Sequence, residues 1–225
     1  ATIANMAVDI GATAAMFPSD EVTEDFLRMN GREDVWFERT TPENAEFEHI
    51  TELDLSEIEP LVACPSNPDN VKPARELSDV PVHQVIIGSS CNGSYRDFMI
   101  AALMVEDKMR HPEVSFEINT GSRQTLVNLM MQGGLEKLVG AGARTHEPGC
   151  LGCIGMGQAP ASGTNSLRTF PRNFKGRSGT KDDAVYLASP ETAAASAIHG
   201  YITDPRTFED YPTVEYPERF AFNEK

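Results

Sequence analysis

The chain has 225 residues, of which 40% are hydrophobic and 24% are charged. This composition is typical of a globular protein with one large or two small domains, and it excludes collagen-like and wholly disordered chains. The 34 acidic and 19 basic side chains give a net charge of −15. Such a charge opposes nucleic-acid binding through phosphate contacts, and it repels an acidic metabolite unless arginines converge locally.

The sequence predicts a protein that neither spans nor binds a membrane. No stretch is apolar for long enough to span a bilayer, and the first twenty residues contain Asn5 and Asp9 but no Lys or Arg, which is not the pattern of a signal peptide. We therefore expect a soluble, cytoplasmic protein. Because the chain opens inside a predicted helix and stops on a tail without a closing element, we also expect a fragment of a longer protein.

The first thirty residues predict two helices. The first covers about residues 1–10 and ends at Gly11, and the second follows Ser19 and ends before Gly31. Residues 32–79 are acidic and rich in proline, which predicts a boundary or a long connection. We therefore expect residues 1–79 to be the end of a preceding α/β domain plus a connection, and residues 80–225 to be a separate α/β domain.

From residue 80 onward, strand-like and helix-like segments alternate. The predicted strands are 85–88, 114–119, 143–146 and 184–188. The predicted helices are 95–109, a segment capped by Ser122, 135–139 and 189–200. This alternation predicts a three-layer α/β/α fold with a mostly parallel sheet, preceded by a short helical segment.

Three cysteines follow predicted strands. Ligands of open α/β sheets bind beyond the carboxyl ends of the strands. Cys91 follows the first predicted strand, and Cys150 and Cys153 follow the third, so the topology carries three thiols to one edge of the sheet. They could hold a zinc ion with Cys64 or His146 as a fourth ligand, act as a redox pair, or hold an iron–sulfur cluster. The glycines around Cys150 and Cys153 favour a loop wrapped round a cluster.

Four sequence blocks identify a family resemblance. In chain order they are GSSCNGSYRD at 88–97, PGCLGCIG at 148–155, RNFKGR at 172–177 and SPETA at 189–193. Together they resemble the aconitase and isopropylmalate dehydratase family. The resemblance extends to residues 1–12, so it covers nearly the whole chain. In the family these segments belong to the end of the second domain and to the cluster-bearing third domain.

The resemblance implies a [4Fe–4S] cluster held by Cys91, Cys150 and Cys153, with one iron left open as a Lewis acid. It implies reversible dehydration of a small anionic hydroxy acid by a hydro-lyase. Because the block at 189–197 looks closer to aconitase than to isopropylmalate dehydratase, citrate or isocitrate is the expected substrate. The base serine and the acid/base histidine–aspartate groups of the family lie in other domains or a further subunit, so we expect the isolated chain to be inactive.

Two pairs of residues are implied as site residues. Arg172 and Arg177 match family positions that contact substrate carboxylates, and a planar guanidinium suits that task because it presents paired donors. Asn5 matches a residue that hydrogen-bonds around the cluster, and Asp9 stands where many members have Glu. These two are the expected catalytic residues, and a spacing of four places them on one face of a helix.

Pro171 departs from the family, which usually carries a hydrogen-bonding residue there, because proline offers no side-chain donor and no backbone N–H. Cys64 has no counterpart in the family and is expected to be buried or in a linker. Two alternatives to the enzyme are a non-catalytic cluster-binding sensor or scaffold, and a structural zinc domain.

Overall fold

The computed structural model describes residues 1–208 and 210–221. Its strands form one seven-stranded sheet in the order β2-β1-β7-β6-β3-β4-β5. The strands are β1 Leu61–Ala63, β2 Val71–Pro73, β3 Gln84–Gly88, β4 Ser115–Asn119, β5 Arg144–Thr145, β6 Asn165–Arg168 and β7 Ala184–Leu187. Strands β7, β6, β3, β4 and β5 pair in parallel, whereas β1 pairs antiparallel with β2 and β7. The predicted α/β class with a mostly parallel sheet is therefore confirmed.

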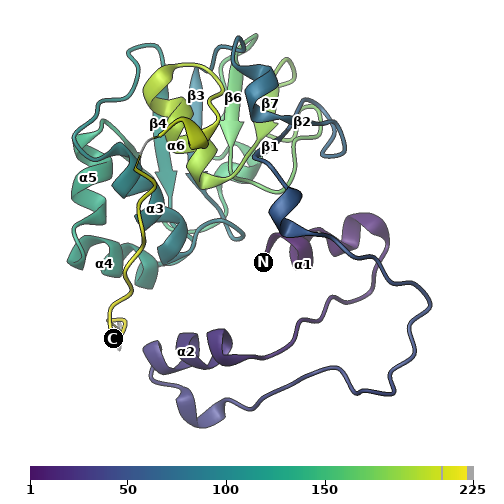
Figure 1. Ribbon diagram of the computed structural model, residues 1–225. Coiled ribbons are helices and arrows are strands. Elements are labelled where there is room, and N and C mark those ends of the chain that lie inside the picture. Colours follow the sequence, from purple (N-terminus) through teal and green to yellow (C-terminus); the bar gives the residue numbers. More distant parts are fainter. Residues whose placement is uncertain (209, 222–225) are drawn as a thin grey trace.

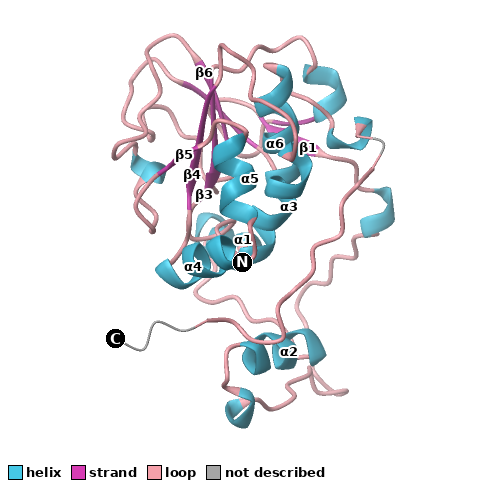
Figure 2. Cartoon of the chain, turned by 90° about the vertical axis from the view of Figure 1, so that its left-hand side faces the viewer, coloured by secondary structure: helices cyan, strands magenta, loops and turns pink. Residues whose placement is uncertain are grey.

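The main helices cover one face of this sheet. Helices α3, α5 and α6 lie on the same side of the strands in Figure 2. Helix α3 packs on α5 and α6, and α6 also packs on β3. The helices are α1 Thr2–Met6, α2 Glu21–Met29, α3 Tyr95–Val105, α4 Arg123–Met131, α5 Gly134–Gly140 and α6 Pro190–His199. Short 3₁₀ turns occupy Ala7–Ile10, Glu33–Val35, Leu55–Glu57, Ala74–Leu77, Gly152–Ile154 and Pro205–Thr207.

Strand β3 connects two apolar clusters because successive side chains of a strand point to opposite faces. Val85 and Ile87 are fully buried in the main core together with residues of the helices. Ile86 packs instead with Cys153 and Phe170 in a small second cluster. One central strand therefore supports both the helical layer and the loop that carries two of the cysteines.

Helix α6 packs closely because its buried side chains are small. Four of its alanines have no exposed surface, namely Ala193, Ala194, Ala195 and Ala197. The side chain of Ser189 caps the helix, Pro190 occupies its first turn, and Gly200 ends it with a positive φ of 81°. The predicted helix at 189–200 is confirmed, and its narrow face allows close approach to α3.

Helix α3 begins as predicted and ends earlier than predicted. Ser94 and Asp97 form a capping box at its start. The helix ends at Val105, short of the predicted residue 109. Asp107 follows with a positive φ of 58°, and this left-handed conformation cannot continue a right-handed helix.

Three strands of the sheet have no counterpart among the predicted elements. Strand β6 lies in the middle of the sheet but contains one apolar residue, Leu167, because Ser166 and Arg168 are buried and hydrogen-bonded instead. Strands β1 and β2 lie within the segment predicted as a connection. They are three residues long, and β2 contains Pro73, which an edge strand tolerates.

Strands β1 and β2 bear on the division into domains, because they belong to the same sheet as β3 to β7. Val62 of β1 and Leu77 of the following turn are buried in the main core. We therefore propose that the boundary expected at residue 79 lies near residue 60.

The segment 12–60 extends away from the sheet, as Figure 1 shows for α2. Helix α2 has no buried residue, and Val22 and Phe26 are 71% and 55% exposed. Hydrogen bonds join its end to the rest of the chain: Asn30 accepts from Gln124, and the carbonyl of Met29 accepts from the backbone N–H of Phe220. Within the described residues, no helix has the length and apolar character needed to span a bilayer.

Candidate functional site

The predicted site residues come from the ends of three parallel strands and from the N-terminal helix. Cys91 follows β3, Cys150 follows β5, and Arg172 follows β6. Helix α1 lies near this edge of the sheet in Figure 1. The side chain of Thr2 donates to Asn92 Oδ1 at 3.5 Å, so α1 contacts the loop that carries Cys91. The four chain segments therefore meet at one place, as the topology predicts.

The turn after β3 needs a glycine to place Cys91. Gly88 has a φ of 144°, and a Cβ atom there would lie 2.0 Å from the carbonyl oxygen of Asn119. Ser89 follows with a positive φ of 82°, and its backbone N–H donates to the same carbonyl. The turn is thereby held against the end of β4, and Cys91 comes directly after it.

The Ser90 hydroxyl lies near the sulfurs of Cys91 and Cys150, and the sulfur of Cys150 lies near that of Cys153. The Sγ atoms of Cys150 and Cys153 are 2.8 Å apart. Ser90 Oγ lies 3.6 Å from the Sγ of Cys150 and 3.9 Å from that of Cys91. Cys91 and Cys153 are buried, whereas Cys150 is exposed. Ser90 thus lies between Cys91 and the Cys150–Cys153 pair, and a metal centre shared by the three thiols stays a prediction.

The paired thiols differ in acidity. Burial raises the pKa of Cys153 to about 12, and the neighbouring Cys150 adds to this effect. Burial also acts to raise the pKa of Cys150, but hydrogen bonds with Cys153 and Ser90 and the charge of Arg177 outweigh it and lower the pKa. Cys150 is therefore the thiol of the pair that ionises first, and a thiolate is the form that binds metal.

Cys64 does not join this group. It is 7% exposed at the end of β1, and its carbonyl oxygen accepts a hydrogen bond from Asn173. Across residues 1–208 and 210–221, no three His, Cys, Asp or Glu side chains are spaced to hold a single metal ion.

Asn5 and Asp9 both bind Arg172. The Oδ1 of Asn5 accepts from Arg172 Nη1 at 2.9 Å, and the carboxylate of Asp9 accepts from Nε at 3.1 Å and from Nη2 at 2.6 Å. The hydrogen bonds from Arg172 lower the pKa of Asp9, and Asp9 in turn raises the pKa of Arg172. Helix α1 ends at Met6 and Asp9 lies in the following 3₁₀ turn, so the two residues do not share one helix as expected. They nevertheless reach the same partner, an arginine of the site.

Arg177 differs from Arg172 because its side chain makes no hydrogen bond or ion pair with the described part of the chain. Both arginines line a pocket of about 120 Å³. The other residues that line it are Asn5, Ser90, Cys150, Cys153, Phe170 and Pro171. Two thiols, two guanidinium groups and the apolar side chains of Phe170 and Pro171 therefore line one pocket. The N–H donors of Arg177 are available there to bind an anion.

Ser90 and Phe170 line the pocket but were not among the predicted site residues. Ser90 is next to Cys91 and lies two residues after β3, so its position beyond the carboxyl end of that strand was the available signal. Phe170 follows β6, which the apolar pattern did not reveal. Pro171 is buried and lines the pocket without offering a donor.

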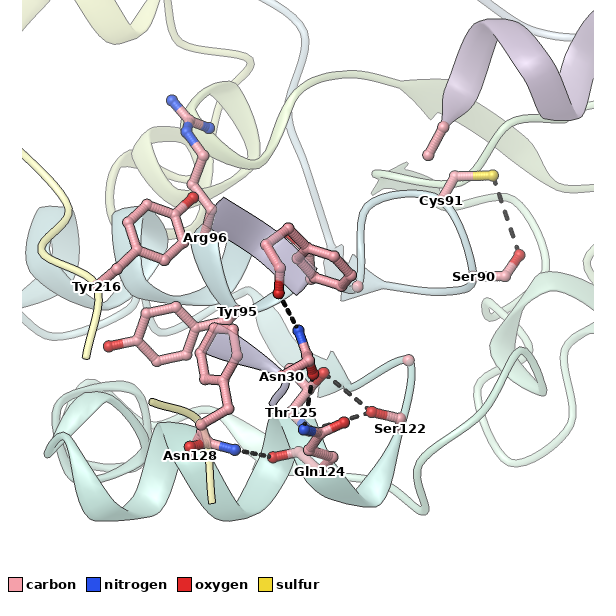
Figure 3. A pocket seen from close by; sticks show the side chains of 16 residues that line it. Asn30, Ser90, Cys91, Tyr95, Arg96, Ser122, Gln124, Thr125, Asn128 and Tyr216 are labelled. Carbon is pink, nitrogen blue, oxygen red and sulfur yellow. Dashed lines mark hydrogen bonds between the residues drawn. The ribbon is translucent and has the colours of Figure 1, made fainter. Parts of the chain in front are cut away.

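A larger pocket of about 540 Å³ lies beside the site, between α2 and the starts of α3 and α4 (Figure 3). Cys91 and Ser90 line one end of it, and aromatic side chains such as Tyr95 line the other. Its arginine, Arg96, pairs with Glu191 at 3.4 Å. An anionic ligand therefore fits the smaller pocket better, since the smaller one contains the unpaired guanidinium.

The sequence of the chain also matches a protein-family model. The model of the aconitase family (aconitate hydratase) matches residues 1–76 and 70–200. The chain belongs to the aconitase family. The family resemblance expected from the four sequence blocks is thereby confirmed.

Curated relatives of this aconitase-family chain include three that are each 41% identical to it. They are 3-isopropylmalate dehydratase large subunit 1 of Thermotoga maritima, the large subunit of Elusimicrobium minutum and large subunit 2 of Archaeoglobus fulgidus. The alignments cover 92%, 91% and 92% of this chain and 50%, 49% and 50% of the relatives. The chain thus spans about half the length of the curated relatives it matches. These names do not support the expected substrate, citrate or isocitrate.

Proposed function

We propose that the chain is the cluster-binding part of a hydro-lyase of the isopropylmalate dehydratase type. The observation that carries the proposal is the gathering of Cys91, Cys150 and Cys153 beside a pocket lined by Arg172 and Arg177. Thiols and guanidinium groups together suit a metal centre that acts on an anion. The relatives named as 3-isopropylmalate dehydratase support a hydroxy dicarboxylic acid of that type as the substrate.

The donor set fits a [4Fe–4S] cluster. Three thiols meet at this edge, and Cys64, the remaining cysteine, is held elsewhere by the contact of its backbone with Asn173. Three protein ligands for four irons leave one iron open. When bound, the cluster would supply a Lewis acid for the substrate hydroxyl that leaves as water.

The residues of this chain would bind and orient the substrate. Arg177 has donors available for a carboxylate, and two parallel N–H groups hold such a group in a fixed orientation. Asn5 and Asp9 hold Arg172 in place, so we assign both as positioning residues for that guanidinium. The base that removes the carbon-bound proton would come from the part of the enzyme outside this chain, in further domains or a small subunit.

Anaerobic reconstitution with iron and sulfide tests the proposal. We expect the wild-type chain to take up about four irons and as many sulfides, with a visible absorption band of the cluster. The Cys150→Ser variant should take up far less. The Cys64→Ser variant is the matched control because it removes a buried thiol outside the site, and it should load like the wild type.

A non-catalytic cluster carrier is the second candidate, and Pro171 favours it because it lines the pocket without a donor. Mixing the loaded chain with the missing half of a 3-isopropylmalate dehydratase separates the two. Hydration of isopropylmaleate by the mixture supports the enzyme, whereas a stable cluster without turnover supports the carrier. A structural zinc domain would instead contain stoichiometric zinc without sulfide.

A further inference from the structure

Arg168 binds the loop between the two paired cysteines. It is the largest fully buried side chain of the described residues, with 0% exposure. Its Nη1 donates to the carbonyl oxygen of Gly152 at 2.9 Å, and its Nη2 donates to that of Gln158 at 2.7 Å. Gly152 lies between Cys150 and Cys153. One guanidinium therefore holds the backbone of the cysteine loop at two points.

The same side chain is anchored in the sheet. Its Nε donates to Ser166 Oγ at 2.8 Å, and Nη2 also donates to Gln84 Oε1 at 3.0 Å. Gln84 in turn donates from Nε2 to Glu117 Oε1 at 3.0 Å. Arg168 thus connects the cysteine loop to strands β3, β4 and β6 through buried hydrogen bonds.

The loop lies in close contact with its neighbours at Gly152. A Cβ atom on Gly152 would lie 2.2 Å from Gln158 Oε1 and 3.0 Å from Phe170 Cζ. The 3₁₀ turn that begins at Gly152 also contains Cys153, whose side chain packs on Ile86 and Phe170. Movement of Arg168 would therefore be passed to Cys153 through one short turn.

The stability of the fold does not by itself explain a buried arginine at position 168. Within residues 1–208 and 210–221, it forms no direct ion pair with a carboxylate. Burial lowers its pKa to about 10, so it is still charged at neutral pH. Burying a charge without an ion-pair partner is costly, and an apolar side chain in such a place is often neutral or stabilising. Nearby negative groups, Glu117 first and then Asp183 and Cys153, act to raise this pKa and partly oppose the effect of burial.

We propose that Arg168 is a positioning residue for the [4Fe–4S] cluster, an inference that rests on the proposed function. Its guanidinium fixes the backbone of the Cys150–Cys153 loop, and its charge offsets the negative charge of the thiolate-bound cluster. A positive charge near a cluster stabilises the reduced form, because net charge is one of the factors that set the reduction potential. Arg168 therefore slows cluster loss and raises the midpoint potential.

Three variants of the full chain separate this role from simple folding. Arg168→Met removes the donors and the charge at similar length, and Arg168→Lys keeps the charge but loses the planar set of donors. Leu167→Ala is the matched control, because Leu167 is the neighbouring residue of β6 and lies in the main core. Each variant is reconstituted anaerobically, and iron content, the rate of cluster loss to a chelator and the midpoint potential are measured.

We expect Arg168→Met to lose the cluster about 10- to 100-fold faster than the wild type, and to show a lower potential. Arg168→Lys should have a midpoint potential close to that of the wild type, but it should still lose the cluster faster. Leu167→Ala should keep the wild-type rate of cluster loss and the wild-type midpoint potential, although it should unfold at a lower temperature. Wild-type loss rates and potentials in both Arg168 variants would overturn the inference while leaving the proposed function intact.

Two further outcomes are decisive. If the Met variant fails to fold, Arg168→Lys alone decides, since loss of its cluster at the wild-type rate would overturn the positioning role. If the wild-type chain takes up no cluster at all, the proposed function fails, and this inference fails with it.

Discussion

At the scale of single residues, Glu117 links the site to the acid stability of the fold. The carboxylate is 1% exposed. Burial acts to raise its pKa, but hydrogen bonds from Gln84 and Ser115 and the charges of Arg144 and His146 outweigh burial and lower it. Because the pKa is lower in the folded chain than in the unfolded chain, Glu117 stabilises the fold above its unfolded pKa. That contribution is lost as the pH falls through the folded value.

We therefore predict that Glu117→Gln lowers the free energy of unfolding by about 1.5 to 3 kcal/mol at pH 7, since hydrogen bonds to a charged group are lost. The difference from wild type should shrink in acid, because the amide does not titrate. Urea unfolding at a series of pH values measures both effects. Glu136→Gln is the control, because Glu136 is exposed on α5. An equal difference at every pH would contradict the account.

Substitution by glutamine should loosen the N-terminal segment at Arg172 but not at Arg177. Arg172→Gln breaks the ion pair with Asp9 and weakens the hold on Asn5, so residues 1–11 should exchange amide hydrogens faster. Arg177→Gln breaks no contact of the described residues, so stability should change by less than about 0.5 kcal/mol. In the reassembled enzyme, the Arg177 variant should raise KM. Faster exchange of residues 1–11 in both variants would contradict this assignment.

At the scale of secondary-structure elements, the start of α3 offers a clean test because Ser94 and Asp97 cap each other's backbone. Ser94→Ala should cost about 1 kcal/mol of unfolding free energy, since one N–H at the helix start loses its acceptor. Ser94→Thr keeps the hydroxyl and should recover most of the loss. Urea denaturation of the three proteins measures it, and equal stability of the Ala and Thr variants would refute the cap.

The apolar pattern predicted those elements that follow simple rules. The predicted strand 85–88 begins with three β-branched residues, and helices α3 and α6 carry Ser caps, so local chemistry identified all three elements. Strand β6 escaped because its buried positions are Ser166 and Arg168, whose burial depends on partners far away in the sequence. The bond between Asp9 and Arg172 was hidden for the same reason, since it joins residues that are 163 positions apart in the chain.

At the scale of the whole molecule, the sheet core and the N-terminal segment make separate contributions. All seven strands lie within residues 61–187, whereas many large apolar side chains before residue 60 are exposed. A chain that starts at residue 60 should therefore unfold cooperatively. A chain that starts at residue 80 lacks β1, β2 and the buried Val62 and Leu77, and should be markedly less stable. Thermal unfolding compares them, and equal midpoints would place the boundary at residue 79.

The net charge of −15 makes the local arginines decisive for an acidic ligand. The two guanidinium groups of the small pocket counter this charge only where the thiols meet, so binding of a diacid should depend on that one place.

We propose that Cys91, Cys150 and Cys153 hold a [4Fe–4S] cluster with one iron open to the substrate. Mössbauer spectroscopy of the chain reconstituted with isotopically enriched iron tests it most directly. We expect one iron to differ from the other three, and its signal alone to shift when 3-isopropylmalate is added. Four equivalent irons that ignore the acid, or no cluster at all, would contradict it.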